Sequence, residues 1–239
     1  MNSDFIGEFS NFSPEGRLYQ IEYALQAVKL GSTVLGIKSD TGIVLAIEKK
    51  KISDLIENKD IEKIIILNKF IFCCFSGLTS DGRLCVEKIR IFLENNFFLF
   101  NNLNSVEKCA KKLRHLISNV TSGENGEMYI NRPLGISFLL CGLDFLGFHL
   151  FLIDPAGNSI EKKIASLGNG SKDAAFVIRE GFRRKMTLEE SKILAIKTMR
   201  VVVENKITEK DLELCLLSSK TKNLAFLDHI QIKSILEHL

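Results

Sequence analysis

Four short segments of this 239-residue chain are rich in apolar residues, and they constrain its fold more than any other feature. They cover residues 61–67, 70–75, 134–143 and 148–153. Each is about as long as a β-strand, and a strand that is apolar on both faces must be covered on both sides. Two antiparallel sheets that pack face to face, with helices on their outer faces, satisfy this requirement.

The segments between these strands predict the helices and the remaining strands. Helical patterns begin at Ser80 and Ser105, and a third helix is expected over residues 172–182. Thr187-Leu-Glu-Glu190 is typical of a capping box and predicts a fourth helix start. Further strands are predicted at 33–37, 43–47, 160–164 and 212–217, and a closing helix at 231–238. This order favours an α+β fold, a four-layer αββα sandwich.

A helix is also predicted before the first strand, over residues 18–30. Its apolar face is formed by residues at helical spacing, namely Leu18, Ile21, Leu25 and Val28. Ser13 can cap its start, and Pro14 stands where a missing N–H has least consequence. Gly31 follows the last apolar position, where we expect a left-handed residue to end the helix.

Composition excludes several classes of protein. Hydrophobic residues make up 46% and charged residues 26%, so the chain can bury a large core. A net charge of +3 is too small to indicate a nucleic-acid partner. The six cysteines form no Cys-x-x-Cys pair, and no secretory signal or membrane-spanning segment is predicted. We therefore expect a reduced, intracellular protein that acts without nucleic acid or membrane.

The residues alone indicate neither a metal site nor a common hydrolase site. The four histidines are scattered and none stands four residues from another, so no metal or cofactor is expected. Residues 168–172, Gly-Asn-Gly-Ser-Lys, lack the spacing of a phosphate-binding loop and are interpreted as a turn before a helix. The chain contains no Gly-x-Ser-x-Gly motif.

The segment 12–48 resembles the signature of proteasome alpha subunits. The matching residues are Phe12-Ser13-Pro14-Glu15-Gly16-Arg17-Leu18, Gln20, Glu22-Tyr23-Ala24, Ala27, Lys29 and Gly31-Ser32-Thr33. Weaker agreement continues through Ile61-Glu62-Lys63-Ile64, Ser76-Gly77-Leu78, Arg132-Pro133-Leu134-Gly135 and Asp154-Pro155-Ala156-Gly157. Residues 29–33 look most like the type-5 member.

The resemblance implies the αββα sandwich of the N-terminal-nucleophile hydrolases, in a single structural domain. Residues 1–30 would form an N-terminal tail and a ring-face helix, and residues 31–239 would form the sandwich. It also implies a place in the core particle, in a seven-membered ring of alpha subunits stacked on a beta ring. The function implied is ubiquitin-dependent protein degradation in cytoplasm and nucleus, with regulatory-particle activators as further partners.

Catalysis in this fold depends on a free N-terminal nucleophile. By resemblance the nucleophile position is Ser32, the acidic position is Glu48 and the lysine position is Lys63. Ser32 lies behind 31 residues, so its nitrogen is an amide and cannot act as a base. We therefore expect no catalytic residue here and assign catalysis to beta subunits. Two alternatives are a hydrolase processed at Ser32 and a homomeric ring scaffold without beta partners.

The resemblance further predicts where other proteins dock. Activators insert C-terminal tails between adjacent alpha subunits, and the matching binding residues are Lys63, Gly77 and Leu78. A lysine ammonium on a flexible stem can meet the terminal carboxylate of such a tail. Pro14 and Tyr23 match positions at the gate and ring face.

The tail departs from the family at one point. Proteasome alpha subunits usually carry Tyr-Asp-Arg seven residues before the Phe12 position, where the three form part of a polar cluster that supports the open gate. Phe5, Ile6 and Gly7 stand there instead and offer no hydroxyl, carboxylate or guanidinium. We therefore expect this tail to contribute little to gating.

Overall fold

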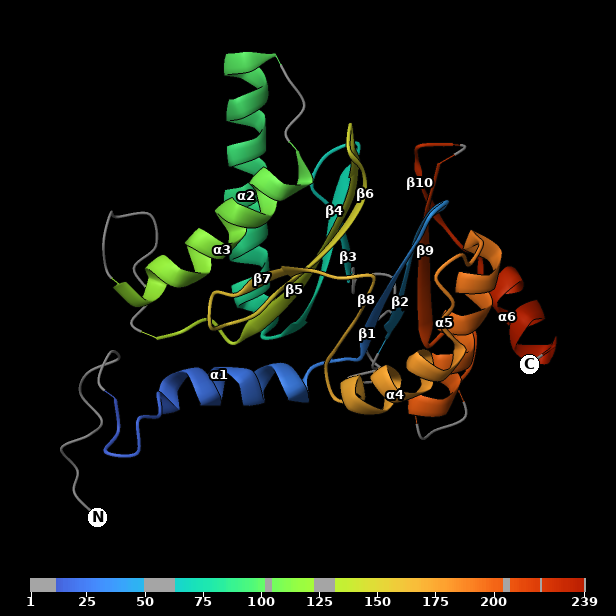
Figure 1. Ribbon diagram of the computed structural model, residues 1–239, viewed down its shortest axis with the longest axis horizontal. Coiled ribbons are helices and arrows are strands. Elements are labelled where there is room, and N and C mark those ends of the chain that lie inside the picture. Colours follow the sequence, from blue (N-terminus) through green and yellow to red (C-terminus); the bar gives the residue numbers. More distant parts are fainter. Residues whose placement is uncertain are drawn as a thin grey trace.

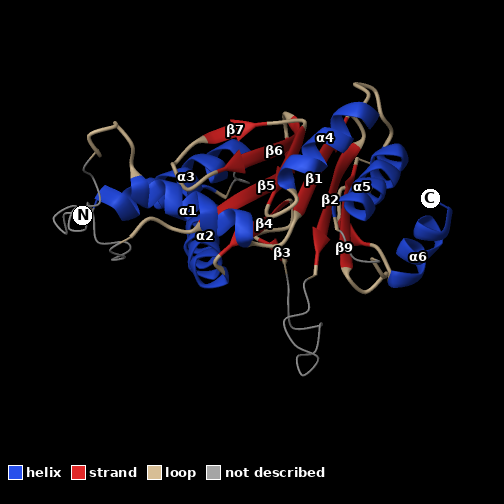
Figure 2. Cartoon of the chain, turned by 90° about the horizontal axis from the view of Figure 1, so that it is seen from below, coloured by secondary structure: helices blue, strands red, loops and turns tan. Residues whose placement is uncertain are grey.

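Two five-stranded antiparallel sheets face each other at the centre of the molecule, with helices on both outer faces (Figure 1). The computed structural model describes residues 12–49, 63–101, 105–122, 132–203, 207–219 and 221–238. The strand order is β10-β9-β2-β1-β8 in the first sheet and β3-β4-β5-β6-β7 in the second. The predicted four-layer αββα arrangement is confirmed, and Figure 2 shows it from a perpendicular direction.

The first sheet combines strands from both halves of the chain. It consists of β1 (Val34–Ser39), β2 (Gly42–Glu48), β8 (Ile164–Leu167), β9 (Leu212–Ser218) and β10 (Leu224–Phe226). β1 and β2 form a hairpin closed by Ser39 and Gly42, and β9 pairs with β2 along its full length. β10 is a short edge strand that the sequence pattern did not predict.

The second sheet contains the four apolar runs. It consists of β3 (Ile64–Ile66), β4 (Ile71–Gly77), β5 (Ile136–Asp144), β6 (Gly147–Ile153) and β7 (Ser159–Glu161). Phe72 and Cys74 of β4 pack between the sheets, whereas Cys73 and Phe75 pack against helices. Both faces of the strand are therefore buried, as its continuous apolar sequence predicts.

In the described part of the chain, five helices cover the outer faces and one lies across an end (Figure 1). α2 (Thr79–Phe100) and α3 (Val106–Ser122) cover the second sheet. The first sheet is covered by α4 (Ser171–Gly181), α5 (Leu188–Val202) and α6 (His229–His238). α1 (Tyr19–Leu30) packs against β4 and β5, at the bottom of Figure 1. Within the described ranges, no helix is long and apolar enough to cross a membrane.

One predicted strand is wrong. Residues 160–164 were expected to form a single strand, but the chain changes sheet there: β7 ends at Glu161 and β8 begins at Ile164. Between them, the Lys162 N–H donates to Leu150 of the second sheet, and Lys163 O accepts from Lys38 of the first. The crossing therefore keeps its backbone hydrogen-bonded to both sheets, which periodicity within one segment cannot reveal.

The capping box at the start of α5 is confirmed. The Thr187 hydroxyl accepts from the Glu190 N–H at 3.2 Å, and the Glu190 carboxylate accepts from the Thr187 N–H at 2.7 Å. These backbone and side-chain hydrogen bonds hold the pKa of the exposed Glu190 carboxyl below its usual value. Leu188 N also donates to Thr41 Oγ1, which ties the helix start to the β1–β2 hairpin.

Candidate functional site

The predicted docking residues lie at one end of the sandwich, which we call the α1 end. It comprises α1, residues 31–33, residues 76–78 and Gly135. Lys63 directly precedes β3, and Gly77 ends the neighbouring antiparallel strand β4, so both stand at the same end of the sheet. Leu78 follows at the start of α2 and is 44% exposed. Lys63 is half-buried.

α1 is held at this end by one narrow face. Ala24 and Val28 are buried, while Leu18, Ile21 and Leu25 of the predicted apolar face are only half-buried. Ser76 Oγ lies 3.1 Å from Val28 O and 2.9 Å from Ser32 O, so its hydroxyl proton can serve either carbonyl. The end of α1 is therefore anchored to β4 by the Ser76 hydroxyl, which binds main-chain carbonyls.

The predicted left-handed residue at Gly31 is wrong. Gly31 is extended, with φ −68° and ψ 170°, so helix termination does not explain the glycine. A Cβ there would lie 2.5 Å from Gly77 N and closer still to Ser76 Oγ. Glycine is present because the end of α1 approaches the backbone of β4 too closely for a side chain.

The predicted cap at Ser13 is also wrong. Its Oγ accepts from the Arg17 N–H at 3.0 Å and closes a separate turn, in which Gly16 has φ +74°. The helix begins later, at Tyr19, and its N-cap residue Leu18 makes no side-chain cap. A tight turn through Pro14 and Gly16 thus intervenes between the serine and the helix.

Pro14 and Tyr23, the predicted gate and ring-face residues, lie on the exposed side of this segment. Tyr23 is 62% exposed, and its ring stacks at 6.4 Å on that of Tyr19. The Arg17 guanidinium lies 5.6 Å from the centroid of the Tyr19 ring and pairs with Glu22 at 2.7 Å. The exposed face of α1 is therefore aromatic and bordered by charge.

The main chain around Ser32 is fixed on both sides. Gly31 O accepts from Asn169 N at 3.1 Å, and Thr33 exchanges hydrogen bonds with Glu48 in both directions at 3.0 Å. Ser32 itself is 6% exposed and joins α1 to β1 through an ordinary peptide. The Glu48 carboxylate thus binds a backbone N–H, and the nitrogen beside Ser32 is no base. The geometry does not favour the hydrolase alternative.

An ion pair between buried Asp81 and half-exposed Arg132 lies next to the Gly135 peptide, which also binds Leu78, and it was missed by the sequence reasoning. The Arg132 guanidinium donates to both oxygens of Asp81 at 2.8 and 2.9 Å, and Gly135 N donates to the same carboxylate at 3.0 Å. Burial would raise the pKa of the Asp81 carboxyl, but the hydrogen bonds from Arg132 and Gly135 outweigh it and lower that pKa. Asp81 thus remains charged although it is only 3% exposed.

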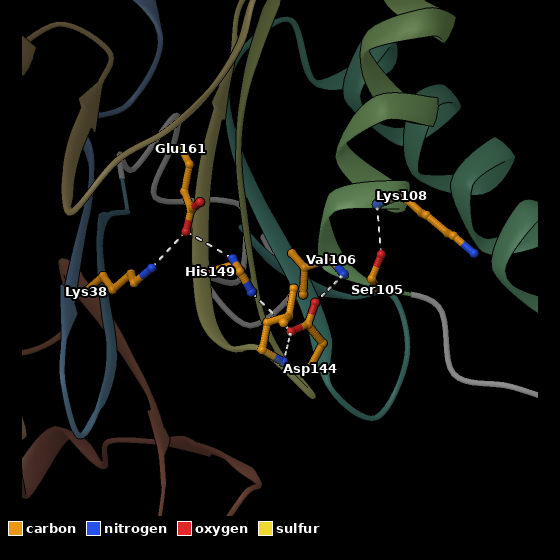
Figure 3. Close-up of polar contacts among 8 residues, drawn as sticks. Lys38, Ser105, Val106, Lys108, Asp144, His149 and Glu161 are labelled. Carbon is orange, nitrogen blue, oxygen red and sulfur yellow. Dashed lines mark hydrogen bonds and ion pairs between the residues drawn. The ribbon is translucent and has the colours of Figure 1, made fainter.

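A second polar cluster lies at the opposite end of the sandwich, which we call the hairpin end because the β5–β6 turn lies there. Figure 3 shows the side chains of this cluster. The two ring nitrogens of His149 face Asp144 at 3.1 Å and Glu161 at 3.0 Å. Glu161 also accepts from Lys38 Nζ of the first sheet at 2.8 Å, and Asp144 accepts from Val106 N at the start of α3. No sequence motif revealed this cluster, since Lys38 and Glu161 are 123 positions apart.

Among the described residues, neither end of the sandwich offers a metal-binding site or a reactive thiol. No group of three histidine, cysteine, aspartate or glutamate side chains there could hold a metal ion. All six cysteines are buried free thiols. Burial raises the pKa of Cys85 and Cys109 to about 12, so these thiols are not reactive near neutral pH.

Comparison with known proteins agrees with the geometry. Residues 28–217 match the family described as "Proteasome subunit", and residues 9–27 match the N-terminal signature of the A-type proteasome subunits. The chain is 35% identical to the probable type-5 alpha subunit of the Schizosaccharomyces pombe proteasome, over 91% of this chain and 89% of the relative. It is 35% identical to the type-5 alpha subunit of the Trypanosoma brucei brucei proteasome, over 95% and 93%.

A further relative, the type-5 alpha subunit of the Drosophila melanogaster proteasome, is 34% identical over 94% of this chain and 93% of its own length. The similarity to type-5 alpha subunits that residues 29–33 predict is therefore confirmed. Alpha subunits assemble with other proteasome subunits, and catalysis resides in the beta type. The chain belongs to the proteasome subunit family, as a non-catalytic subunit of the alpha ring.

Proposed function

We propose that this chain occupies one position in a seven-membered alpha ring stacked on a beta ring, with α1 on the ring face. The observation that carries the proposal is the two-sided character of α1. One face buries Ala24 and Val28 against the sandwich, while Tyr23 and Leu30 are 62% and 79% exposed. Such apolar exposure on a helix is typical of a surface that a neighbouring chain covers.

Within the ring, Pro14 and Tyr23 would form this subunit's part of the gate and ring face. Both are exposed, and the turn that holds Pro14 is closed by the Ser13–Arg17 hydrogen bonds. Phe5, Ile6 and Gly7 lie outside the described residues. Because they lack polar groups, this tail would contribute little to holding the gate open. Residues 1–30 would thus form the tail and ring-face helix, and residues 31–239 the sandwich.

Lys63, Gly77 and Leu78 would bind the C-terminus of an activator. Their common position at the α1 end supports this assignment, as does the exposure of Leu78. A charge-assisted hydrogen bond from a lysine to a terminal carboxylate contributes roughly 1.5–3 kcal/mol. Its loss would weaken docking about 10- to 150-fold.

Docking is tested with native particles that carry Lys63→Ala. A C-terminal activator peptide with a photo-crosslinker reports how occupancy of this position in the ring rises with peptide concentration. Lys69→Ala is the matched control, because this exposed lysine lies in the β3–β4 turn, beyond the opposite end of the same strands. Equal crosslinking of wild type and Lys63→Ala would contradict the assignment.

The cellular role would be ubiquitin-dependent protein degradation in cytoplasm and nucleus. Purification of the tagged chain from native extract, with identification of the copurifying subunits, tests the ring assignment. We expect other alpha-type subunits and beta-type subunits to copurify. A complex of this chain alone would instead support the homomeric scaffold. The intact mass decides the hydrolase alternative, because cleavage before Ser32 would remove the first 31 residues.

A further inference from the structure

We propose that Asp81 and Arg132 are positioning residues for the activator site, because together they fix the Gly135 peptide against Gly77 and Leu78. This inference rests on the proposed docking role of Lys63, Gly77 and Leu78. It adds two residues that need not touch the activator but would set the shape of the surface that receives it.

Both backbone polar groups of Gly135 are hydrogen-bonded to the segment that connects β4 to α2. Its carbonyl accepts from Leu78 N at 3.0 Å, and its N–H donates to Asp81 Oδ2 at 3.0 Å. Leu78 is the N-cap residue of α2, and Asp81 lies in the first turn of that helix. The connection from β4 to α2, which carries the docking residue Leu78, therefore also binds Gly135, the residue just before β5.

Close packing couples Gly135 to the docking residues. A Cβ on Gly77 would overlap Gly135 O, and Gly77 has φ +119°. A Cβ on Gly135 would lie 3.1 Å from Leu78 Cδ1 and 3.2 Å from Ala27 Cβ of α1. Because these atoms pack so closely, a displacement of Gly135 toward them would move Gly77, Leu78 or α1.

Arg132 is what allows Asp81 to hold Gly135. The Asp81 side chain is 4% exposed, whereas that of Arg132 is 45% exposed and keeps part of its guanidinium in water. The two parallel hydrogen bonds from the Arg132 guanidinium fix the plane of the Asp81 carboxylate. They thereby fix the position of the oxygen that accepts from Gly135 N. Without the guanidinium, a buried charge would be unpaired and would draw in water or move.

The test compares assembled particles that carry Arg132→Gln, Arg132→Lys, or Asp81→Asn together with Arg132→Gln. The readout is the crosslinking affinity of the C-terminal activator peptide at this position in the ring, measured only in particles that contain the variant. We expect Arg132→Gln to weaken docking about 2- to 30-fold, the range found for residues that act through others. Lys38→Gln, which removes an ion pair at the hairpin end, is the matched control and should change nothing.

The other two variants separate positioning from folding. Arg132→Lys keeps the charge but not the two parallel hydrogen bonds, so its docking affinity should lie between those of wild type and Arg132→Gln. The double variant removes the buried charge and leaves an amide oxygen for Gly135 N, so affinity should partly recover. A role in folding alone would lower the amount of variant in particles and leave the affinity of those particles unchanged.

Each outcome decides between the two proposals. If Lys63→Ala weakens docking and Arg132→Gln does not, the inference is wrong and the docking site stands. If Lys63→Ala has no effect, the docking site itself is wrong, and the inference falls with it. If Arg132→Gln does not enter particles, Arg132→Lys decides, and wild-type affinity in that variant overturns the inference.

Discussion

The two ends of the sandwich are held in different ways. At the α1 end, main chain packs closely on main chain, and the Asp81–Arg132 pair holds one of these contacts; a side chain on Gly31, Gly77 or Gly168 would collide with main-chain or short polar atoms. At the hairpin end, Asp144 and His149 lie among side chains that reach across from other strands. Close backbone contact cannot adjust to a change, whereas a polar cluster can rearrange and admit water.

This difference suits the proposed function of the α1 end. A site that binds the C-terminus of another chain needs a fixed shape, and closely packed main chain provides one. The hairpin end has no proposed ligand, and its cluster joins β1 of one sheet to β6 and β7 of the other. We therefore expect substitutions at the α1 end to be the more damaging, and four predictions test this.

The largest effect is expected for Gly77→Ala, compared with Gly147→Ala. Both glycines have nearly the same φ, +119° and +120°, so an alanine is strained by a similar amount in each, about 1–3 kcal/mol. At Gly147 nothing lies within 4 Å of the added Cβ, whereas at Gly77 it would overlap Gly135 O. We expect Gly77→Ala to destabilise by at least about 4 kcal/mol and to prevent entry into particles.

Quantitative mass spectrometry of native particles measures this difference as the incorporated fraction of each variant. Gly147→Ala serves as the control for backbone strain and should be incorporated nearly as wild type. Equal incorporation of the two variants would show that the close approach of β4 and β5 imposes no constraint.

Much of the fold could be predicted because it follows from local patterns. The apolar runs required cover on both faces, and the two faces of strand β4 are indeed buried in different layers. The capping box at Thr187 was identified because its two partners are three residues apart. The cap at Ser13 and the strand over 160–164 failed because a turn and a change of sheet interrupted those patterns.

The site was less accessible to sequence reasoning, because its contacts join distant residues. Gly31 was recognised as a special position, but the reason is a contact with Ser76 and Gly77, far along the chain. Asp81 showed no signal of its own, and Arg132 appeared only within a weak resemblance. An acidic residue early in an apolar helix, with an arginine before a strand, could have suggested the pair but not its contact with Gly135.

Arg132→Met is expected to have the second largest effect. The substitution leaves the Asp81 carboxylate buried without its charged partner, which destabilises by about 3 kcal/mol, the low end for buried pairs because Arg132 is half-exposed. Hydrogen exchange in assembled particles measures the loss at the Leu78 and Gly135 amides. Adding Asp81→Asn to Arg132→Met should restore part of this protection. If the amides of the double variant exchange as fast as those of Arg132→Met, the charge argument is wrong.

At the hairpin end, Asp144→Ala should destabilise by about 2 kcal/mol. The carboxylate accepts from Val106 N at the start of α3 and from Leu146 N in the β5–β6 turn, and both would lose their acceptor. Hydrogen exchange at these two amides reports the effect, which should stay local. Asp144→Asn retains an acceptor and should lose less. Loss of protection at Gly135 in Asp144→Ala would show that the two ends are not independent.

The smallest effect is expected for Lys38→Met, less than about 1 kcal/mol at neutral pH. Its partner Glu161 has a side chain that is 41% exposed and also contacts His149, so the carboxylate can turn to water when Lys38 is lost.

Burial would raise the pKa of the Glu161 carboxyl, but the hydrogen bonds from Lys38 and His149 outweigh it and hold that pKa below the ordinary 4.5. A carboxyl with a lowered pKa stabilises the fold above its ordinary value, and this contribution is lost as pH falls through the folded value. The difference in protection between wild type and Lys38→Met at positions 38 and 161 should therefore be present at pH 7 and vanish once acid protonates Glu161 in the folded protein, at a pH lower than 4.5. Matched measurements of both proteins at each pH cancel the intrinsic pH dependence of exchange. A difference as large as that of Arg132→Met, or one that persists after Glu161 is protonated, would mean that the hairpin end is as rigidly constrained as the α1 end.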